Sequence, residues 1–376
     1  MNRIGFLDYT KAWSIILVIA IHVGFSQLNY AVLFVMPAFY IITGYGFNPD
    51  KRSVGKSISS RFKALMIPFW VFMILYTLIE LIRAPLFGYG GAEVAIASLA
   101  NTAYGSGIIP LWGGAADYLK EIMSYKTQGL VGVDTILPTN CHLWFLPATF
   151  TGYVAFVLLE KPTGKSLVAK ILAILALLAF ASVEVIFPSV WQLPYGIGRG
   201  AVAAAYMLVG LWIKQSGAIE KKSVPFHIVA CLVAAAVAVG ATLLGSDASA
   251  MLRSYYGPYG ALSLLLTFLG GVAATWLLFE LFRGVDALPV APLKKFLSFT
   301  GRNVFTVYIL HMAVKFLFDC IYVLWIAKGE TDILDEYKMG LMPEKSVLYM
   351  LFEIVAVVAV CLLIAMLKNR IMKRKA

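Results

Sequence analysis

The sequence predicts an all-α integral membrane protein with about ten transmembrane helices and both termini in the cytoplasm. This prediction rests on the composition, on the length of the apolar stretches and on the distribution of basic residues. Hydrophobic residues make up 61% of the 376 residues and charged residues only 14%, with a mean hydropathy of +0.83. A soluble domain carries about 25% charged residues. A compact globule of this length has too little interior for so much apolar surface, so lipid must cover the excess.

Ten apolar stretches are long enough to cross a bilayer. A helix that spans a hydrocarbon core of about 30 Å needs roughly 20 predominantly apolar residues. No small-residue cleavage site follows the first stretch, which contains His22, so we expect a retained helix rather than a signal peptide. The predicted spans are about 12–28, 30–47, 66–84, 143–160, 168–187, 195–213, 225–244, 259–282, 303–325 and 347–367.

The basic residues concentrate in alternate loops, and this predicts the orientation. With a cytoplasmic N-terminus, the inner segments hold 21 of the 31 basic residues and the outer segments hold 6. The outer segments, about 85–142, 245–258 and 326–346, also hold ten of the twenty acidic residues. The net charge of +11 therefore faces anionic lipid and cytosol, and nucleic acid is not expected as a partner.

We expect a single transmembrane domain over residues 1–376, with outer loops at about 85–142 and 326–346. The longer loop is rich in glycine and aromatic residues, which suits a folded cap or a re-entrant segment. The four histidines are scattered and have no metal-site spacing, so no metal is expected. Spacing alone does not decide whether Cys141 and Cys320 pair. The oligomeric state also stays open, a homo-oligomer included.

Ionisable groups in the first span are the first candidates for chemistry, because such groups are expensive in a membrane and usually functional. Lys11 and His22 are eleven residues apart, which puts them on one helix face with His22 about 16 Å deeper. Asp8 falls on the same stripe. This places a cation at the inner mouth and an imidazole, the usual general base near neutral pH, about halfway across. Alternatively, Asp8 and Lys11 form an interfacial pair and a neighbouring helix satisfies His22.

The loop before the third span carries five basic residues that could hold a polyanionic ligand such as a nucleotide-bearing cofactor. For Lys51, Arg52 and Lys56 we expect ordinary positive-inside anchoring. Arg61 and Lys63 stand where the third helix is predicted to begin. They either point inward to such a ligand or anchor the helix as well.

Two further segments carry polar groups at helix ends. Trp144 belongs to a Trp/Phe pair typical of an interfacial belt, whereas His142 faces the outer loop, where a polar acceptor could dock. Arg302 and Asn303 stand at the cytoplasmic start of the ninth span, where an anionic donor would enter. The same span carries a polar stripe of three residues four apart: His311, Lys315 and Asp319. Glu353 in the tenth span is a candidate partner, and the stripe is either a buried ion-pair network or a substrate-facing surface.

Together these segments resemble membrane-bound acyltransferase family 3, bacterial enzymes that O-acylate extracytoplasmic polysaccharides and related acceptors. The family hallmark is a basic residue, ten intervening residues and a His in the first helix, which Lys11 and His22 match. Most members of the family have Arg at the basic position. A Lys there, as in this chain, resembles the branch that contains the fucose 4-O-acetylases. Asp8 fits the acid that usually precedes it. Further similar segments follow in family order at 39–45, 61–69, 143–146 and 301–311.

The resemblance implies roles for these residues. Acyl-CoA from the cytosol would be the co-substrate, with no permanently bound cofactor. His22 would be the catalytic base, assisted by Lys11. The residues expected to bind the CoA phosphates are Lys11, Arg61, Lys63 and Arg302. The residues expected to contact the acceptor or to support the site are Asp8, His142, Trp144, Asn303, Tyr308 and His311.

We therefore expect an O-acyltransferase of the bacterial cytoplasmic membrane that moves an acyl group to a hydroxyl of an extracytoplasmic or lipid-linked glycan. We expect the transferred acyl group to be acetyl, with succinyl as a close alternative. The expected partners are membrane lipid and the glycan or glycolipid acceptor. The alternative is a transporter of a glycan or small anion, supported by ten spans and scattered intramembrane charges. Against it stand the absence of a half-to-half repeat and of paired Gly/Pro-broken helices.

Overall fold

The structure is a helical bundle. The computed structural model describes residues 4–25, 32–51, 53–86, 141–186, 196–220, 223–244, 261–326 and 345–375. Its α-helices are α1 (Gly5–Val23), α2 (Val32–Tyr45), α3 (Val54–Leu86), α6 (Phe145–Thr163), α7 (Leu167–Ile186), α8 (Ile197–Ser216), α9 (Val224–Leu243), α10 (Ala261–Ala287), α11 (Ala291–Arg302), α12 (Val304–Ile321) and α14 (Val347–Lys375). Short 3-10 turns precede α3 (Pro49–Lys51) and α6 (Cys141–Trp144), and a π-helical turn (Tyr322–Ile326) follows α12.

Each of the ten predicted spans coincides with one α-helix, which confirms the all-α membrane fold. Seven helices in the described part of the chain are long and apolar enough to cross a membrane by themselves, and two shorter apolar segments lie at Val35–Tyr45 and Leu167–Val183. The exact number of crossings remains a prediction. The outer loops, predicted at about 85–142 and 326–346, fall mainly outside the described residues.

The two largest differences from the prediction concern the start of the third helix and the segment before the ninth span. The third helix begins at Val54 rather than near residue 66, so its basic residues lie on the helix and not in a loop. The segment predicted as a loop before the ninth span contains α11, which starts with a proline in its first turn. This helix exposes Leu293 and Phe296 beside two lysines, so it is amphipathic and too polar to appear in a search for apolar spans.

Close packing between α2 and α8 organises the centre of the bundle. Fourteen of the twenty α8 residues are buried, many of them Ala or Gly. A Cβ added to Gly44 would lie 1.9 Å from the carbonyl oxygen of Met207, and one added to Gly210 would lie 2.0 Å from that of Ile41. Only glycine permits such an approach, and small residues are the usual means by which membrane helices pack.

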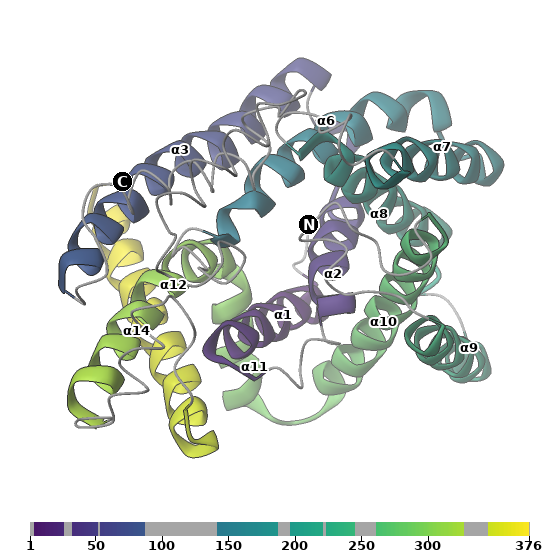
Figure 1. Ribbon diagram of the computed structural model, residues 1–376. Coiled ribbons are helices and arrows are strands. Elements are labelled where there is room, and N and C mark those ends of the chain that lie inside the picture. The colour runs from purple at the N-terminus through teal and green to yellow at the C-terminus, as the bar shows by residue number, and fades with distance from the viewer. Residues whose placement is uncertain are drawn as a thin grey trace.

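The outer surface of the bundle is apolar. Leu243 of α9 is 80% exposed and Leu348 of α14 is 79% exposed, and many other large apolar side chains on α3, α7, α9 and α14 are exposed as well. In Figure 1, α9 lies at one edge of the bundle and α3 at the opposite edge, with α1 between them. A soluble monomer does not expose so much apolar surface, whereas lipid covers it without penalty.

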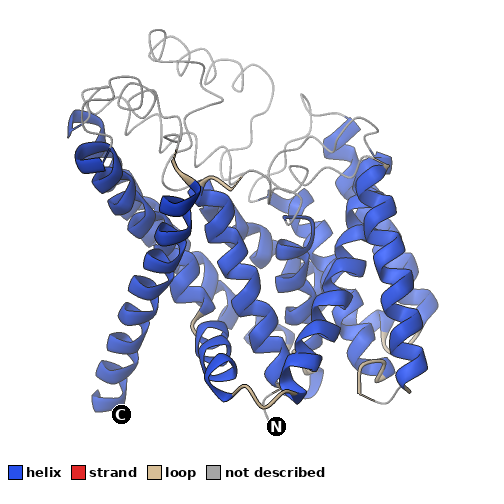
Figure 2. Ribbon diagram, turned by 90° about the horizontal axis from the view of Figure 1, so that it is seen from below, coloured by secondary structure: helices blue, strands red, loops and turns tan. Residues whose placement is uncertain are grey.

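The two ends of the bundle provide the frame for the site. Figure 2 shows that α1 begins and α14 ends at the same end of the bundle. We call this end the terminal end and the opposite one the far end. The arrangement agrees with the prediction that both termini lie on one side of the membrane, and the positive-inside rule predicts that this side is the cytoplasmic one.

Candidate active site

The central feature of the site is a pair of histidines contributed by α1 and α12. Nδ1 of His22 lies 3.2 Å from Nε2 of His311, and the two ring centroids are 5.2 Å apart. His22 is in the last turn of α1, which ends at Gly24 with a φ of +124°, a conformation that favours glycine. The predicted base therefore lies close to the far end of its helix, and its partner is a residue 289 positions away.

Hydrogen bonding indicates which nitrogen of each ring carries a hydrogen. Nδ1 of His311 lies 2.6 Å from the backbone oxygen of Tyr308, and a carbonyl can only accept. In a neutral His311 ring, Nδ1 is therefore the donor and Nε2 the acceptor, so His22 donates through its own Nδ1. The backbone carbonyl of Val18, one turn earlier on α1, is a second acceptor for the His22 ring. A neutral imidazole carries one ring N–H, so Nε2 of His22 retains its lone pair. A general base requires such a lone pair.

The backbone beside His311 is fixed by α3. The Tyr76 hydroxyl donates to the carbonyl of Ile309 at 2.7 Å and accepts from the amide of Ala313 at 3.3 Å. In a regular α-helix, this amide would donate directly to this carbonyl. Here the Tyr76 hydroxyl is inserted between the two groups and bridges them. Tyr76 is 1% exposed, and its ring ties α3 to the turn of α12 that carries His311.

Asp8 and Lys11 lie near the start of α1, toward the terminal end. The Lys11 ammonium donates to Oδ1 of Asp8 at 2.9 Å, and Asp8 is buried while Lys11 is partly exposed. A Cβ on Gly301 would lie 1.9 Å from the carbonyl oxygen of Asp8, so the end of α11 packs directly on α1 at this level. The ion pair that the sequence left open is thus present. From here to His22 the helix rises about 16 Å.

The other residues predicted to bind the donor lie on separate helices. The Arg61 guanidinium stands over the Tyr153 ring at 4.9 Å, which joins α3 to α6. Lys63 is exposed on α3. Arg302 is exposed and its Nε donates to the carbonyl of Ser298 at 3.0 Å within α11. The structure does not bring these cations together with Lys11 through any recorded bond between described residues.

Asn303 has a structural position at the junction of α11 and α12. Its amide nitrogen donates to the carbonyl of Phe299 at 2.8 Å, and its amide oxygen accepts from Asn369 of α14 at 3.0 Å. It therefore ends one helix, starts the next and ties both to α14. Its role as an acceptor or supporting residue stays a prediction, and the geometry supports the second of these.

Aromatic rings connect the predicted residues of the fourth span to the histidine pair. Tyr308 lies with its ring centroid 6.0 Å from that of His311 and 5.5 Å from that of Phe145. Trp144 is buried and its ring faces the Arg199 guanidinium at 5.3 Å. The side chains of His142 and Cys141 lie outside the described residues, so neither the role of His142 nor the Cys141–Cys320 pair is tested.

The cavity beside this aromatic group is too small for a sugar. It lies between α2, α8 and α10, is lined in part by Tyr40, Arg199 and Thr267, and has a volume of about 10 Å³. Such a space holds about one water molecule. The Thr267 hydroxyl has no partner among the described residues, which is the arrangement that a single buried water would satisfy.

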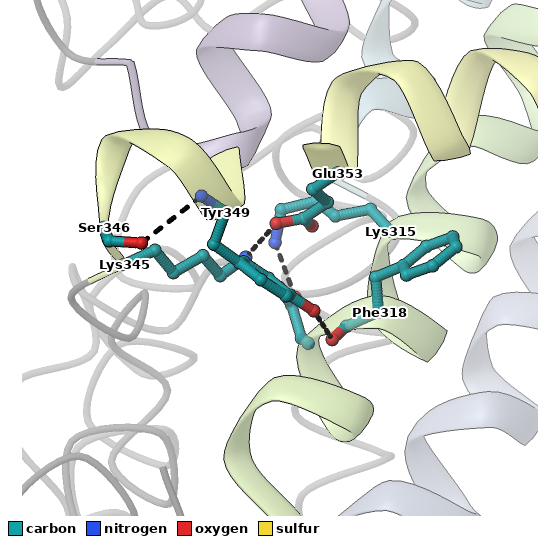
Figure 3. Close-up of polar contacts among 7 residues, drawn as sticks. Lys315, Phe318, Lys345, Ser346, Tyr349 and Glu353 are labelled. Carbon is teal, nitrogen blue, oxygen red and sulfur yellow. Dashed lines mark hydrogen bonds and ion pairs between the residues drawn. The ribbon is translucent and has the colours of Figure 1, made fainter. Parts of the chain in front are cut away.

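A cluster of four charged residues lies beyond the histidine pair, toward the far end: Lys315, Asp319, Lys345 and Glu353 (Figure 3). The sequence predicted the stripe on α12 and Glu353 as its partner, and the structure joins them through Lys345. Sequence reasoning missed Lys345 because it counted as one more outer-loop cation. A lysine two residues before an apolar span was the available signal.

Other candidate sites are limited. His227 bridges α9 and α10, with its Nδ1 2.6 Å from Glu280 and Arg283 within 3.1 Å of its ring. This arrangement is an ion-pair network at the bundle edge. Within the part of the chain that the structure describes, no group of three or more His, Cys, Asp or Glu side chains is arranged to hold a metal ion.

These observations define a class: a multi-pass membrane protein with a paired histidine at the end of its first helix. The sequence profile of a family described as the acyltransferase domain, acyltransferase 3, matches residues 4–366. The chain therefore belongs to the acyltransferase 3 family, as the resemblance predicted, and it is a membrane acyltransferase. A search of curated proteins and a search of solved structures gave no match.

Proposed function

We propose that this protein transfers an acyl group, acetyl in the first place, from cytosolic acyl-CoA to a hydroxyl of an extracytoplasmic or lipid-linked glycan. The observation that carries the proposal is the hydrogen-bonded pair of His22 and His311. Family membership favours acyl transfer over the transporter alternative. The acyl donor, the glycan acceptor and a bacterial cytoplasmic membrane are the parts that we infer from the resemblance to the family.

His22 has the surroundings of a general base. Its Nε2 removes the proton of the acceptor hydroxyl, while its Nδ1–H is held by His311. The ring becomes a cation at the C-terminal end of α1, where the helix dipole stabilises positive charge by about 0.3–1 kcal/mol, and more in a buried setting. The resulting alkoxide attacks the acyl carbonyl. Collapse of the intermediate releases the CoA thiolate, which takes the proton back from His22.

The two ends of α1 support entry of the two substrates from opposite sides. Lys11 at the terminal end is partly exposed and Arg302 is exposed, so a phosphate of CoA has cations within reach of the cytosol. Arg61 and Lys63 on α3 would hold other phosphates of the same donor. The pantetheine arm then follows α1 toward His22, over a rise of about 16 Å. The hydroxyl acceptor arrives from the far end, close to which His22 lies.

A direct assay tests the proposal. The purified protein in nanodiscs is incubated with radiolabelled acetyl-CoA and a panel of soluble glycosides, and CoA release and label transfer are followed. We expect transfer in the wild type and a loss of 10²- to 10⁴-fold or more in His22→Gln, as for removal of a general base. Binding of CoA, measured from its effect on thermal unfolding, is expected to persist in the variant.

The matched control is His227→Gln, which removes a histidine from the bundle edge and leaves the proposed site intact. Its activity should equal that of the wild type. If the wild type neither binds nor consumes acetyl-CoA or succinyl-CoA, the acyl-CoA proposal is wrong. If His22→Gln is as active as His227→Gln, the protein is an acyltransferase with another base.

A further inference from the structure

The charged cluster beyond the histidine pair consists of two lysines and two carboxylates. Lys315 donates to Oδ2 of Asp319 at 2.6 Å, one turn apart on α12. Lys345 bonds Oδ1 of Asp319 and lies 2.5 Å from Oε2 of Glu353 on α14. Lys315 is 7% exposed, Asp319 5% and Glu353 0%. Figure 3 shows the side chains of Lys315 on α12 and Glu353 on α14 converging with that of Lys345, which lies just before α14.

Bond counting separates the two lysines. An ammonium group has three N–H donors. Lys345 uses its donors on Asp319 and Glu353, and thus holds the two helices together. For Lys315, Asp319 is the one hydrogen-bond partner that the structure records among the described residues. Lys315 therefore keeps two N–H donors without a recorded acceptor in a buried setting, where unused donors are costly.

The position of Lys315 relates these donors to the proposed reaction. It follows His311 by four residues, so it lies on the same face of α12, one turn nearer the far end. His311 in turn contacts His22 through a hydrogen bond of 3.2 Å. The cation thus lies one turn from the histidine that contacts the proposed base, on the side from which we propose that the acceptor arrives.

The proposed reaction at His22 produces a transient negative charge, which a nearby cation would stabilise. When the acceptor oxygen forms its bond to the acyl carbon, the carbonyl π electrons move to the oxygen and produce an oxyanion. The oxyanion disappears when the C–S bond breaks and CoA leaves. Preorganised donors in a site with little water stabilise this transient charge strongly. Of the two lysines in the cluster, Lys315 has two donors without a recorded acceptor among the described residues, whereas Lys345 has one.

We propose that the ammonium group of Lys315 stabilises the oxyanion that forms on the acyl carbonyl beside His22, and that Asp319, Lys345 and Glu353 hold this ammonium in place. The inference rests on the proposed acyl transfer. Asp319 offsets one unit of charge and accepts one hydrogen bond, so the lysine stays ionised and oriented while two donors remain for the substrate. The other members of the cluster act as positioning residues.

A pair of CoA analogues tests the proposal without turnover. S-carboxymethyl-CoA carries a carboxylate near the acyl position, and S-carbamoylmethyl-CoA carries a neutral amide of nearly the same shape. We expect the wild type to bind the carboxylate about tenfold more tightly, as for one charge-assisted hydrogen bond. In Lys315→Met this preference should vanish, whereas His22→Gln and the buried-lysine control Lys170→Met should retain it.

Kinetics of acetyl transfer provide the second measurement. Removal of an oxyanion donor lowers kcat by about 10²- to 10³-fold, so Lys315→Met should lose this much while CoA binding is unchanged. The double variant Lys315→Met/Asp319→Asn restores charge balance to the cluster. We expect it to regain thermal stability but to remain as slow as Lys315→Met.

The outcomes separate the two proposals. If neither analogue binds the wild type, acyl-CoA is not the donor and the proposed function fails. If both analogues bind the wild type equally, or if the carboxylate preference survives in Lys315→Met, the oxyanion role is wrong although acyl transfer stands. The role is also wrong if the double variant is as fast as Asp319→Asn, because Lys315 would then only neutralise Asp319.

Discussion

The charged side chains at the two ends of the bundle have different surroundings. At the terminal end, four cations lie on three helices and are exposed or partly exposed: Lys11, Arg61, Lys63 and Arg302. Lys11 and Arg302 bond within their own helices, and Arg61 stands over the Tyr153 ring of α6. Near the far end, the charges of α12 and α14 are buried and bonded to one another. Solvated cations can take up an external anion, whereas buried and paired ones are already oriented. This difference is what we expect if the donor binds at the terminal end and the proposed chemistry takes place near the far end.

The largest expected effect concerns the buried end. Lys345→Met leaves two carboxylates without their shared cation, and breaking a buried ion pair from one side costs about 3–5 kcal/mol. We expect a loss of this size in the free energy of unfolding, measured by denaturant titration in detergent. Lys165→Met, which changes an exposed lysine at the terminal end, should cost far less.

The double variant Lys345→Met/Glu353→Gln sharpens this contrast. Neutralising both partners removes most of the penalty, so its stability should lie between those of the wild type and of Lys345→Met. Equal stability of Lys345→Met and Lys165→Met would show that the cluster is solvated like the terminal end, and the comparison would not hold.

The second effect concerns the histidine pair. His311→Ala removes the acceptor that orients His22, and we expect kcat to fall by about 10- to 100-fold. Binding of CoA should not change, because the basic residues proposed to bind its phosphates lie at the terminal end of the bundle. His311→Gln supplies an amide oxygen that can accept from His22, so it should recover part of the loss. Equal kcat in the Ala and Gln variants would argue against an orienting hydrogen bond.

The third effect concerns backbone packing in the centre. Gly44→Ala forces a Cβ against the backbone of Met207, and overpacking of this kind costs about 1–3 kcal/mol. A Cβ at Gly240 of α9 would have open space around it, with no atom within 4 Å, so Gly240→Ala is the matched control. Thermal unfolding should separate the two variants. If the two variants unfold at the same temperature, α2 and α8 do not pack so closely that glycine is required between them.

The smallest expected effect is at the terminal end. Lys11→Met or Arg302→Gln removes one cation from a solvated surface, so the Michaelis constant for acetyl-CoA should rise about two- to fivefold with little change in kcat. Added salt should shrink this difference, because solvent screens exposed charges. A loss of kcat without a change in the Michaelis constant would instead assign these residues to the chemical step.

Sequence reasoning predicted the ten helices because each is a continuous apolar segment, and such a segment can be recognised from its length alone. It failed at α11, which is amphipathic and short, and at the start of α3, where polar residues continue a helix. In the site, it predicted His22 and the stripe on α12 that includes His311 as separate features. It could not predict that His22 and His311 touch, because 289 positions separate them and periodicity gives no information on contacts between helices.

The sequence by itself determined the membrane class, the helices, the expected orientation and the identity of the ionisable groups, because hydropathy, charge bias and helical spacing are local properties. The tertiary structure decided which of these groups meet. It paired His22 with His311, left Nε2 of His22 with its lone pair, and placed Lys345 between Asp319 and Glu353. Such contacts depend on how helices cross, and crossing is set by backbone approach at positions such as Gly44 and Gly301.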